Sequence, residues 1–557
     1  MPDFKSAIIY QIYPRSFNDT DGDGIGDLMG IIQKLDYLHD LGVDILWLSP
    51  IFPSPNADNG YDVSDYKGIM PEFGDMDDFE ELLAGVHKRG MRLMLDLVVN
   101  HGSDEHPWFV ESRKSKDNPY RDYYIWRSPK QDNSPDQSVP NEPNDWISIF
   151  SGPAWTFDEA TGEYYLHLFL DKQPDLNWEN PALRQDVYRM MQFWLSKGVD
   201  GFRMDVIPFI SKEQSFPDFP SGRFGDTSVY ANGPRVHEFL REMNREVLSQ
   251  YDCISIGEGV GISPEQARLY VGEDRQELNM IYHFGHAIPR DEQHFSQPAP
   301  EFTLLELKHI FATWDLALES KDGTGEGWQN IYFGNHDNPR SVSRFGNTDQ
   351  FHYESATMLA TVLLTQRGTP TIYQGDEIGM TNCHFNDITK FNDVQVLSAY
   401  EALVSTGKVS EAAFLKSVNY IGRDHARTPM QWFNGPNAGF TTGKPWLNVN
   451  PNYSQINVAD QQVQDDSILS FYRQLIRWRR KTPAIWDGTY TDLLPDHPTV
   501  WAYERVLKNG RIIVLANFSS EEVCTPEAEL GELVLSNYVT PALALRPYEA
   551  RVLYAVN

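Results

Sequence analysis

The sequence predicts an α/β protein built on a closed (β/α)8 barrel, or TIM barrel, with an inserted domain and a C-terminal antiparallel β domain. Eight short apolar runs are typical of buried parallel strands, and stretches with helical periodicity separate most of them. The third run is followed by a long segment rich in Pro, Asn, Asp and Ser, which indicates an insertion. From about residue 487 the helical pattern gives way to short alternating strands.

The first predicted strand, residues 7–13, is a β-branched and aromatic run that ends at Pro14. The other seven strands are predicted at residues 44–48, 92–98, 201–205, 254–257, 280–282, 331–333 and 371–373. Helical spacing is found at residues 28–41, 79–88, 187–195, 236–248 and 358–364. Gly42 and Gly90 follow two of these helices as typical C-terminal stops. Alternating strands and helices indicate parallel βα units, and eight of them close a barrel.

These patterns divide the chain into three predicted domains. The barrel takes residues 1–101 and 175–486, and the inserted domain takes residues 102–174. Residues 487–557 are predicted to form a C-terminal β-sandwich domain, whose clearest strands are 499–505 and 511–517.

Composition excludes several classes of partner. The 557 residues carry a formal net charge of −32, which disfavours binding to nucleic acid or to an anionic membrane. The three cysteines form neither a disulfide framework nor a metal-binding pattern. No apolar run reaches membrane-spanning length, and the N-terminus lacks the features of a signal peptide. We therefore expect a cytoplasmic monomer, with a mature form that has lost a signal peptide as the alternative.

An Asp-rich loop, DTDGDGIGD (19–27), follows the first strand. Alternating Asp and Gly residues are typical of an oxygen-ligand loop for Ca²⁺. The predicted ligands are the carboxylates of Asp19, Asp21, Asp23 and Asp27 and the backbone carbonyl of Ile25. A solvated turn is the alternative, but four carboxylates so close together would repel one another without a cation.

Charged residues also lie at the ends of several predicted strands. In GFRMDVI (201–207), strand alternation places Arg203 and Asp205 on the same side. Such a pair is either a structural ion pair or a catalytic carboxylate kept ionised by the guanidinium. Glu258 ends the fifth strand and Asp337 follows the seventh. Because strand ends meet on one face of a barrel, the convergence of three carboxylates favours the catalytic interpretation.

Two carboxyl groups, one ionised and one protonated, can cleave a glycosidic bond. We expect Arg203 to keep Asp205 ionised as the nucleophile. Glu258 has no cation beside it in the sequence, which suits the acid/base. We expect Asp337 to stabilise the positively charged transition state and to bind sugar hydroxyls. Two further side chains at these strand ends are expected to donate hydrogen bonds to other hydroxyls: His101 and His336.

Four motifs, in this order, resemble the signature regions of the α-amylase family of glycoside hydrolases (GH13): DLVVNH (96–101), GFRMDVI (201–207), GE (257–258) and NHDN (335–338). QPDLNW (173–178) is similar to a fifth region in the form typical of oligo-1,6-glucosidases and their relatives, which include dextran glucosidases and sucrose isomerases. The resemblance covers almost the entire chain. It implies a calcium-containing (β/α)8 barrel, and it gives Asp205, Glu258 and Asp337 the roles already expected of them.

The resemblance also implies a substrate pocket. Asp58, Tyr61 and Arg423 are similar to the groups that enclose the terminal glucose, with Arg427 as the competing choice for the arginine. An Asp–Arg wall would turn an open cleft into a dead-end pocket, which predicts exo-cleavage of one glucose. Two residues on the side of the inserted domain are expected to line the same pocket: Phe169 and Gln173.

The residue after the nucleophile bears on linkage. Val206 resembles the α-1,6-specific members of the group, whereas Thr at this position is typical of α-1,4-glucosidases and sucrose isomerases. The resemblance therefore implies a retaining, exo-acting α-glucosidase that releases terminal glucose from short α-1,6-linked oligosaccharides such as isomaltose and isomaltulose. The segment Gly259-Val260-Gly261 departs from the α-1,6 pattern, so the resemblance does not define the subsite that binds the leaving group.

Two alternatives remain. Arg340 and Arg344, in the segment after the seventh strand, are compatible with a sucrose isomerase or a sucrose- or trehalulose-hydrolysing α-glucosidase. A non-catalytic sugar-binding relative is the alternative from another functional class. It is disfavoured because such proteins typically lose one of the three carboxylates, and all three are present here.

Overall fold

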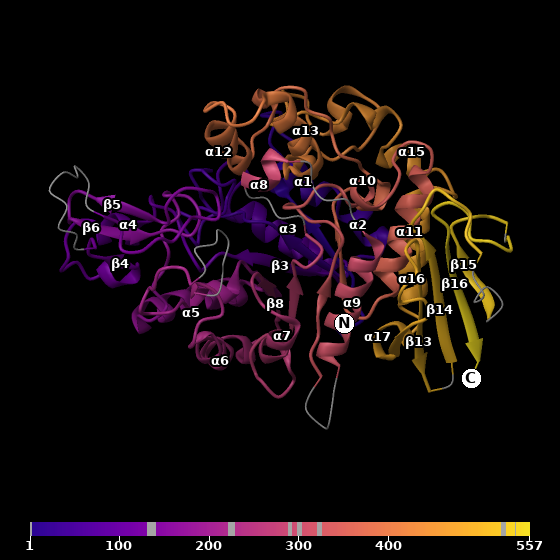
Figure 1. Cartoon of the computed structure of the whole chain (residues 1–557), viewed down its shortest axis with the longest axis horizontal. Coiled ribbons are helices and arrows are strands. Elements are labelled where there is room, and N and C mark those ends of the chain that lie inside the picture. The colour runs from indigo at the N-terminus through magenta and orange to yellow at the C-terminus, as the bar shows by residue number, and fades with distance from the viewer. Residues whose placement is uncertain are drawn as a thin grey trace.

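A parallel sheet of eight strands lies at the centre of the protein (Figure 1). The computed structural model describes residues 3–130, 141–220, 229–287, 292–297, 303–319, 326–508, 510–524, 531–540 and 542–556. The strand order is β10-β11-β1-β2-β3-β7-β8-β9, and a parallel bridge between Ile281 and Gln329 joins the two outer strands. The predicted (β/α)8 barrel is therefore confirmed. Its strands are β1 (Ile9–Ile12), β2 (Ile45–Leu48), β3 (Arg92–Leu97), β7 (Gly201–Met204), β8 (Ile254–Gly259), β9 (Met280–His283), β10 (Asn330–Ile331) and β11 (Thr369–Tyr373).

Helices follow the barrel strands along the chain. The predicted helix at 28–41 is two helices, α1 and α2, that meet at Lys34. Helix α3 begins before the predicted residue 79 because the Asp75 side chain accepts hydrogen bonds from the first-turn amides and forms a capping box. These helices are α1 (Leu28–Gln33), α2 (Leu35–Leu41), α3 (Met76–Lys88), α5 (Pro181–Lys197), α6 (Val236–Glu246), α7 (Pro264–Val271), α9 (Leu304–Leu318), α10 (Ser341–Phe345), α11 (His352–Thr365) and α16 (Ile468–Arg479).

A helical layer that the sequence patterns did not predict lies between β11 and α16. It packs against α8 around the buried side chains of Phe385, Val396 and Phe414. The layer matters for the site because it carries Arg423 and Arg427 back over the barrel. Its helices, with the short ones nearby, are α8 (Glu292–Ser296), α12 (Val394–Leu403), α13 (Glu411–Ile421), α14 (Asp424–Arg427), α15 (Val458–Gln462) and α17 (Ala484–Asp487).

The inserted segment after β3 forms a small antiparallel sheet, with strand order β4-β6-β5, and projects from one end of the molecule (Figure 1). Its aromatic core includes Trp146 and Trp155, and it is continuous with Phe209 and Tyr230 from the chain after β7. Residues 131–140 of the predicted insertion lie outside the described residues. The elements are α4 (Pro107–Ser112), β4 (Trp126–Arg127), β5 (Trp155–Asp158) and β6 (Glu163–Leu166).

The C-terminal region forms a five-stranded antiparallel sheet at the opposite end of the molecule (Figure 1). One face packs on α11 of the barrel. The other face would meet a second sheet in the predicted β-sandwich. Among the described residues it is covered instead by non-strand segments that carry Leu494, Val523 and Leu545. The strands are β12 (Thr489–Asp492), β13 (Val500–Leu507), β14 (Gly510–Asn517), β15 (Glu532–Ser536) and β16 (Ala550–Val556).

Within the described part of the chain, no helix is both long and apolar enough to cross a membrane.

Candidate active site

The motif GFRMDVI forms β7 and the turn that follows it. Gly201 is required here because a Cβ atom at this position would lie 2.1 Å from the Ile254 carbonyl oxygen of β8. Arg203 is paired in register with Asp96 of β3, and both side chains are buried. Arg203 Nη1 donates hydrogen bonds to Asp96 Oδ1 and Asp205 Oδ1, each at 2.8 Å. The predicted pairing of Arg203 with Asp205 is therefore present, but Asp96 shares it.

Glu258 also lies against this guanidinium. Its Oε1 is 2.6 Å from Arg203 Nη2, so the adjacent strand supplies the cation that the sequence does not place beside Glu258. The sequence hides this pair because β7 and β8 are adjacent strands, whose register brings Met204 beside Gly257. The Glu258 and Asp205 side chains also form a hydrogen bond with each other. Three carboxyl groups thus share one cation.

Burial sets the protonation of these groups. It raises the pKa of Glu258 to about 8, against the opposing charge of Arg203 and with the help of the nearby Asp205 and Asp337 charges. It raises the pKa of Asp205 to about 7 and that of Asp96 to about 6, and in both cases Arg203 opposes the rise. Because the charges of Asp205 and Glu258 repel each other, the first proton that the pair takes up leaves one acid and one ionised carboxylate in the same site.

Asp337 lies in a loop, because β10 ends at Ile331, before the predicted end of this strand at residue 333. The Asn335 side chain accepts a hydrogen bond from the Asp337 amide at 2.9 Å, and this Asx-turn presents the carboxylate. Asp337 Oδ1 in turn accepts hydrogen bonds from Arg423 Nη1 at 3.2 Å and from Arg427 Nη2 at 3.1 Å. Both candidate arginines therefore reach this carboxylate.

Arg423 is the arginine that meets Asp58, which favours it over Arg427. Its Nη2 lies 3.8 Å from Asp58 Oδ1. The Asp393 carboxylate accepts hydrogen bonds from Arg423 Nε at 3.0 Å and from Nη2 at 2.5 Å. Gln173 is fully buried and donates to Asp58 Oδ2 at 3.2 Å, so it holds Asp58 in place. The predicted Asp–Arg wall is thus assembled from three distant parts of the chain.

Two neutral histidines flank the carboxylates. Burial lowers the pKa of His101 to about 4 and that of His336 to about 3. His336 stacks on Tyr61, and its Nε2 is 2.7 Å from the Tyr61 hydroxyl and 3.2 Å from Asp337 Oδ2. The buried Nε2 of His101 has no hydrogen-bond partner among the described residues. His101 can thus exchange a hydrogen bond with a sugar hydroxyl, whereas both ring nitrogens of His336 already contact protein groups, Gln11 at Nδ1 and Tyr61 at Nε2.

An apolar wall stands beside these polar groups. Phe169 packs on His101, with ring centres 4.7 Å apart, and on Phe150 at 5.4 Å. Phe150 in turn lies under the Arg423 guanidinium at 5.3 Å. Val206 belongs to the same apolar cluster as Phe169 and is 6% exposed. Its φ of 34° lies in the left-handed region, which is strained for a β-branched residue.

Sequence reasoning missed three residues of the site: Tyr282, Phe150 and Asp393. Tyr282 is the next-to-last residue of β9, and its hydroxyl forms hydrogen bonds with both Arg203 and Glu258. A search for polar groups at strand ends could have found it, had it included the tyrosine of the sixth strand. Phe150 and Asp393 lie on segments between strands, where the sequence carries no comparable positional signal.

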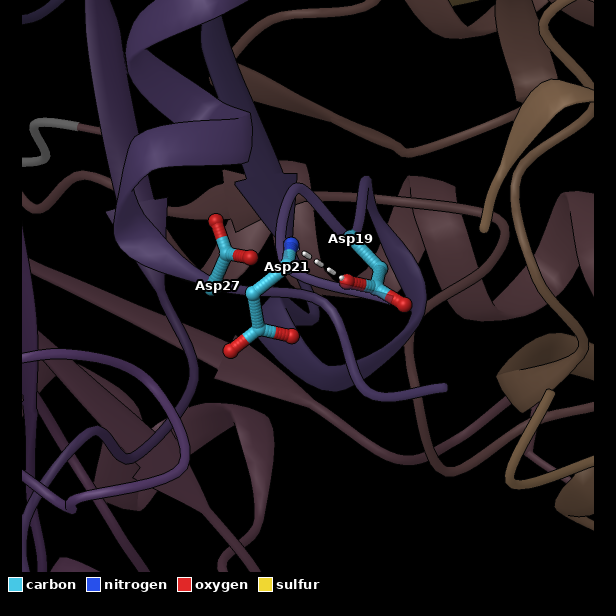
Figure 2. A group of neighbouring side chains, drawn as sticks. All are labelled: Asp19, Asp21 and Asp27. Atoms are coloured by element: carbon cyan, nitrogen blue, oxygen red, sulfur yellow. Dashed lines mark hydrogen bonds between the residues drawn. The ribbon is translucent and has the colours of Figure 1, made fainter. Parts of the chain in front are cut away.

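The Asp-rich loop brings three carboxylates together away from this cluster. Ligand atoms of Asp19, Asp21 and Asp27 all lie within 4.8 Å of one another (Figure 2). Asp23 is not part of this group, and its Oδ1 instead accepts a hydrogen bond from the Ile25 amide at 2.7 Å. No described Lys or Arg forms an ion pair with the three carboxylates. An all-oxygen, uncompensated anionic set of this kind fits a hard cation such as Ca²⁺.

Comparison with known proteins agrees with this geometry. The model of the alpha amylase catalytic domain matches residues 11–488. Oligo-1,6-glucosidase of Parageobacillus thermoglucosidasius is 51% identical over 567 residues, covering 99% of this chain and 98% of the relative. The oligo-1,6-glucosidase of Bacillus cereus is 50% identical over 563 residues, with 99% and 98% covered.

Among solved structures, a mutant isomaltulose synthase from Erwinia rhapontici NX5, in complex with its natural substrate sucrose, superimposes with a TM-score of 0.94. It is 43% identical to this chain, and the match covers 100% of both chains. The resemblance stated from the sequence motifs is confirmed by a family match and by close relatives that span the whole chain. The chain is an enzyme of the α-amylase family of glycoside hydrolases.

Proposed function

We propose that this enzyme is a retaining, exo-acting α-glucosidase that removes the terminal glucose from short α-1,6-linked gluco-oligosaccharides. The observation that carries the proposal is that Asp205 and Glu258 both contact the Arg203 guanidinium. Arg423, which pairs with Asp58, also donates a hydrogen bond to Asp337. Carboxyl groups in direct contact leave no room for a water molecule between them, which favours a covalent intermediate over a single inversion. Relatives named oligo-1,6-glucosidase support the choice of linkage.

In the first step, an Asp205 oxygen attacks the anomeric carbon while Glu258 gives its proton to the leaving glycosidic oxygen. The C1–O bond breaks, the leaving group departs as a neutral alcohol, and a β-glucosyl ester forms on Asp205. Asp337 faces the positive charge that develops on the sugar ring. Arg423 and Arg427 hold that carboxylate in position through Oδ1.

In the second step, Glu258 is ionised and removes a proton from water as the water attacks C1. The ester bond to Asp205 breaks, and glucose leaves with the α configuration of the substrate. The buried Asp58–Arg423 pair beyond the first glucose would block a longer chain on that side. The glucose that is released is therefore the non-reducing terminal residue.

A panel of isomaltose, isomaltulose, trehalulose, sucrose and maltose tests this function directly. We expect glucose release from isomaltose, with α-glucose as the first product seen by NMR before mutarotation. Release of β-glucose would rule out retention. Consumption of maltose or sucrose without any cleavage of isomaltose would rule out the α-1,6 assignment, and failure to turn over any α-glucoside would support a non-catalytic sugar-binding protein.

Sucrose isomerisation is the second candidate, because isomaltulose synthase has the same fold at 43% identity. The structure gives one reason to rank it lower. Arg340 is 1% exposed and donates to the carbonyl oxygens of Gln374 and Ala426 at 2.6 and 3.2 Å. The Arg340 side chain thus has a structural role in the interior of the protein and is not available to bind a fructose leaving group. A sucrose isomerase would be recognised in the panel by the formation of isomaltulose or trehalulose from sucrose.

Val206→Thr is expected to shift the preference of the enzyme from α-1,6 towards α-1,4 linkages. The substitution keeps the branched shape but puts a hydroxyl into an apolar cluster beside Asp205. We expect the ratio of kcat/KM for isomaltose to that for maltose to fall about 10-fold, the size of a single-group discrimination. Val206→Ile, which adds no hydroxyl, is the control and should leave the ratio on the α-1,6 side. An unchanged ratio in Val206→Thr would remove Val206 from the linkage argument.

We also propose that the Asp-rich loop binds Ca²⁺. Asp19, Asp21 and Asp27 supply the three converging carboxylates, and Asp23 and the Ile25 carbonyl stay predicted ligands. Asp19 and Asp27 also have structural duties: Asp19 accepts from the Thr441 hydroxyl, and Asp27 caps α1 by accepting from Gly30 N at 2.6 Å. A cation here would fix the loop to the first barrel helix. It lies outside the catalytic cluster and takes no part in the chemistry.

Calcium is expected to raise the melting temperature by a few degrees. At a free calcium concentration of 100 times the Kd, binding adds about 2.7 kcal/mol to the stability of the folded state. Asp21→Asn should abolish this increment with little change in the melting temperature of the calcium-free protein, since Asp21 is the exposed member of the trio. Asp40→Asn, at another exposed aspartate, is the matched control. A melting temperature that is the same with calcium and after exhaustive chelation would contradict the proposal.

A further inference from the structure

The hydroxyl of Tyr282 lies between the Arg203 guanidinium and the Glu258 carboxyl group. Tyr282 is the direct neighbour of Glu258 in the parallel register of β8 and β9, and its side chain is 1% exposed. The hydroxyl accepts from Arg203 Nε at 2.9 Å and Nη2 at 2.7 Å, and it donates to Glu258 Oε1 at 3.0 Å. We propose that Tyr282 is a positioning residue for acid/base catalysis, which fixes Glu258 so that the proton it transfers sits on Oε2.

Counting donors and acceptors fixes the direction of these hydrogen bonds. A guanidinium has only donors, so both contacts between Arg203 and Tyr282 use the oxygen of the phenol as acceptor. The single phenol proton is then left for Glu258, the remaining partner. Arg203 therefore does more than attract the glutamate by its charge. It also orients the phenol, and the phenol orients the carboxyl group.

The same count assigns the transferable proton of Glu258. Oε1 accepts a hydrogen bond from the Tyr282 hydroxyl and lies 2.6 Å from Arg203 Nη2, so one neutral and one cationic donor already lie beside it. Oε2 receives one donor, the Val206 amide at 2.7 Å. A proton on Oε1 would face two other donors, whereas a proton on Oε2 would face one, so the proton of Glu258, which also makes the hydrogen bond with Asp205, sits on Oε2. The strained, left-handed backbone of Val206 is what aims that amide at Oε2.

This arrangement serves both steps of the proposed hydrolysis, and the inference rests on that function. In the first step it presents the Oε2 proton to the leaving oxygen. In the second step the ionised Glu258 keeps the donor at Oε1, while Oε2 faces the water. Because the phenol donates to the carboxylate, it favours the ionised form and opposes the rise in pKa that burial causes.

Tyr282→Phe tests the inference, with Tyr332→Phe as the matched control. Tyr332 is also a buried barrel tyrosine, in ring contact with Tyr282 at 5.3 Å, but its hydroxyl donates to the His283 carbonyl at 2.9 Å. Both variants lose one buried phenol, and only the first loses a bond to Glu258.

For Tyr282→Phe we expect kcat/KM on isomaltose to fall about 10- to 100-fold, the range for a lost hydrogen bond to a charged group. On 4-nitrophenyl α-glucoside, whose leaving group needs little protonation, the loss should stay within about 3-fold. The basic limb of the pH profile should move to higher pH, because the ionised form of Glu258 loses a donor. Tyr332→Phe should change neither the substrate ratio nor the limb.

The ratio between substrates and the position of the limb do not depend on the fraction of enzyme that is folded. Incorporation of 3-fluorotyrosine at position 282, which keeps the shape and makes the phenol a stronger donor, should move the basic limb to lower pH. Equal losses on both substrates, or a limb that stays in place in both variants, would overturn the inference. If the wild type cleaves another disaccharide but not isomaltose, the proposed linkage fails, and the same comparison on that disaccharide still decides the role of Tyr282.

Discussion

Asp205→Asn is expected to abolish turnover without lowering the stability of the protein. An amide cannot form the glucosyl ester, so kcat on isomaltose should fall by about 10⁴-fold or more, as when a nucleophile is removed from other enzymes. Stability should be equal or higher because Asp205 is one of three carboxyl groups on one guanidinium, and burial disfavours its charge. Activity assays and thermal melts measure the two effects independently.

Asp96→Asn is the matched control for this variant. It removes a neighbouring buried carboxylate that contacts the same Arg203 nitrogen at the same 2.8 Å distance. Because Asp96 does not meet the anomeric carbon in the proposed mechanism, this variant should still form a covalent intermediate. Mass spectrometry of quenched reactions should detect one added glucosyl residue in the control and none in Asp205→Asn. A glucosylated Asp205→Asn protein would show that another residue is the nucleophile.

The barrel could be predicted because a buried parallel strand leaves a simple record in the sequence. Strands such as β3 and β8 are buried on both faces and apolar side chains recur along them, so their positions are clear without any knowledge of their partners. The carboxylates at their ends could be placed on one face for the same reason. The helical layer after β11 was missed because its helices follow no repeating βα order.

The pairing of charges could not be predicted in the same way. Arg203 was assigned to Asp205 because the two are neighbours in one strand, but its contacts with Asp96 and Glu258 depend on strand order and register. The clamp of Asp393 on Arg423 depends on how two segments of the helical layer fold back over the barrel. Sequence patterns give the position of a charge along the chain, whereas its partners are a property of tertiary structure.

Glu258→Gln is the second large prediction, and it separates the two steps of the reaction. The variant keeps the shape of the side chain but cannot give a proton to the leaving oxygen. We expect kcat/KM on isomaltose to fall about 10²- to 10⁴-fold, the usual contribution of general acid–base catalysis. The loss on 4-nitrophenyl α-glucoside should be much smaller, because this leaving group departs without a proton. Unaltered turnover of isomaltose would reject Glu258 as the acid.

The pH profile of the same variant provides an independent test. The wild type needs Glu258 protonated, and burial raises the pKa of this group to about 8, so kcat/KM should fall as pH rises above that value. In Glu258→Gln this basic limb should disappear. The acidic limb should remain, because it follows protonation of Asp205, whose pKa burial raises to about 7. A basic limb that persists in the variant would belong to another group.

Azide tests the second step in the Glu258→Gln variant. Once the aryl glucoside has glucosylated Asp205, water needs a base to attack, whereas azide is already an anion and needs none. Added azide should therefore raise the steady-state rate of the variant and leave the wild type unchanged. Because azide attacks a β-linked ester from the opposite face, the product should be α-glucosyl azide. Formation of the β-azide would mean that the intermediate is absent, and the case for a retaining enzyme built on Asp205 and Glu258 would fail with it.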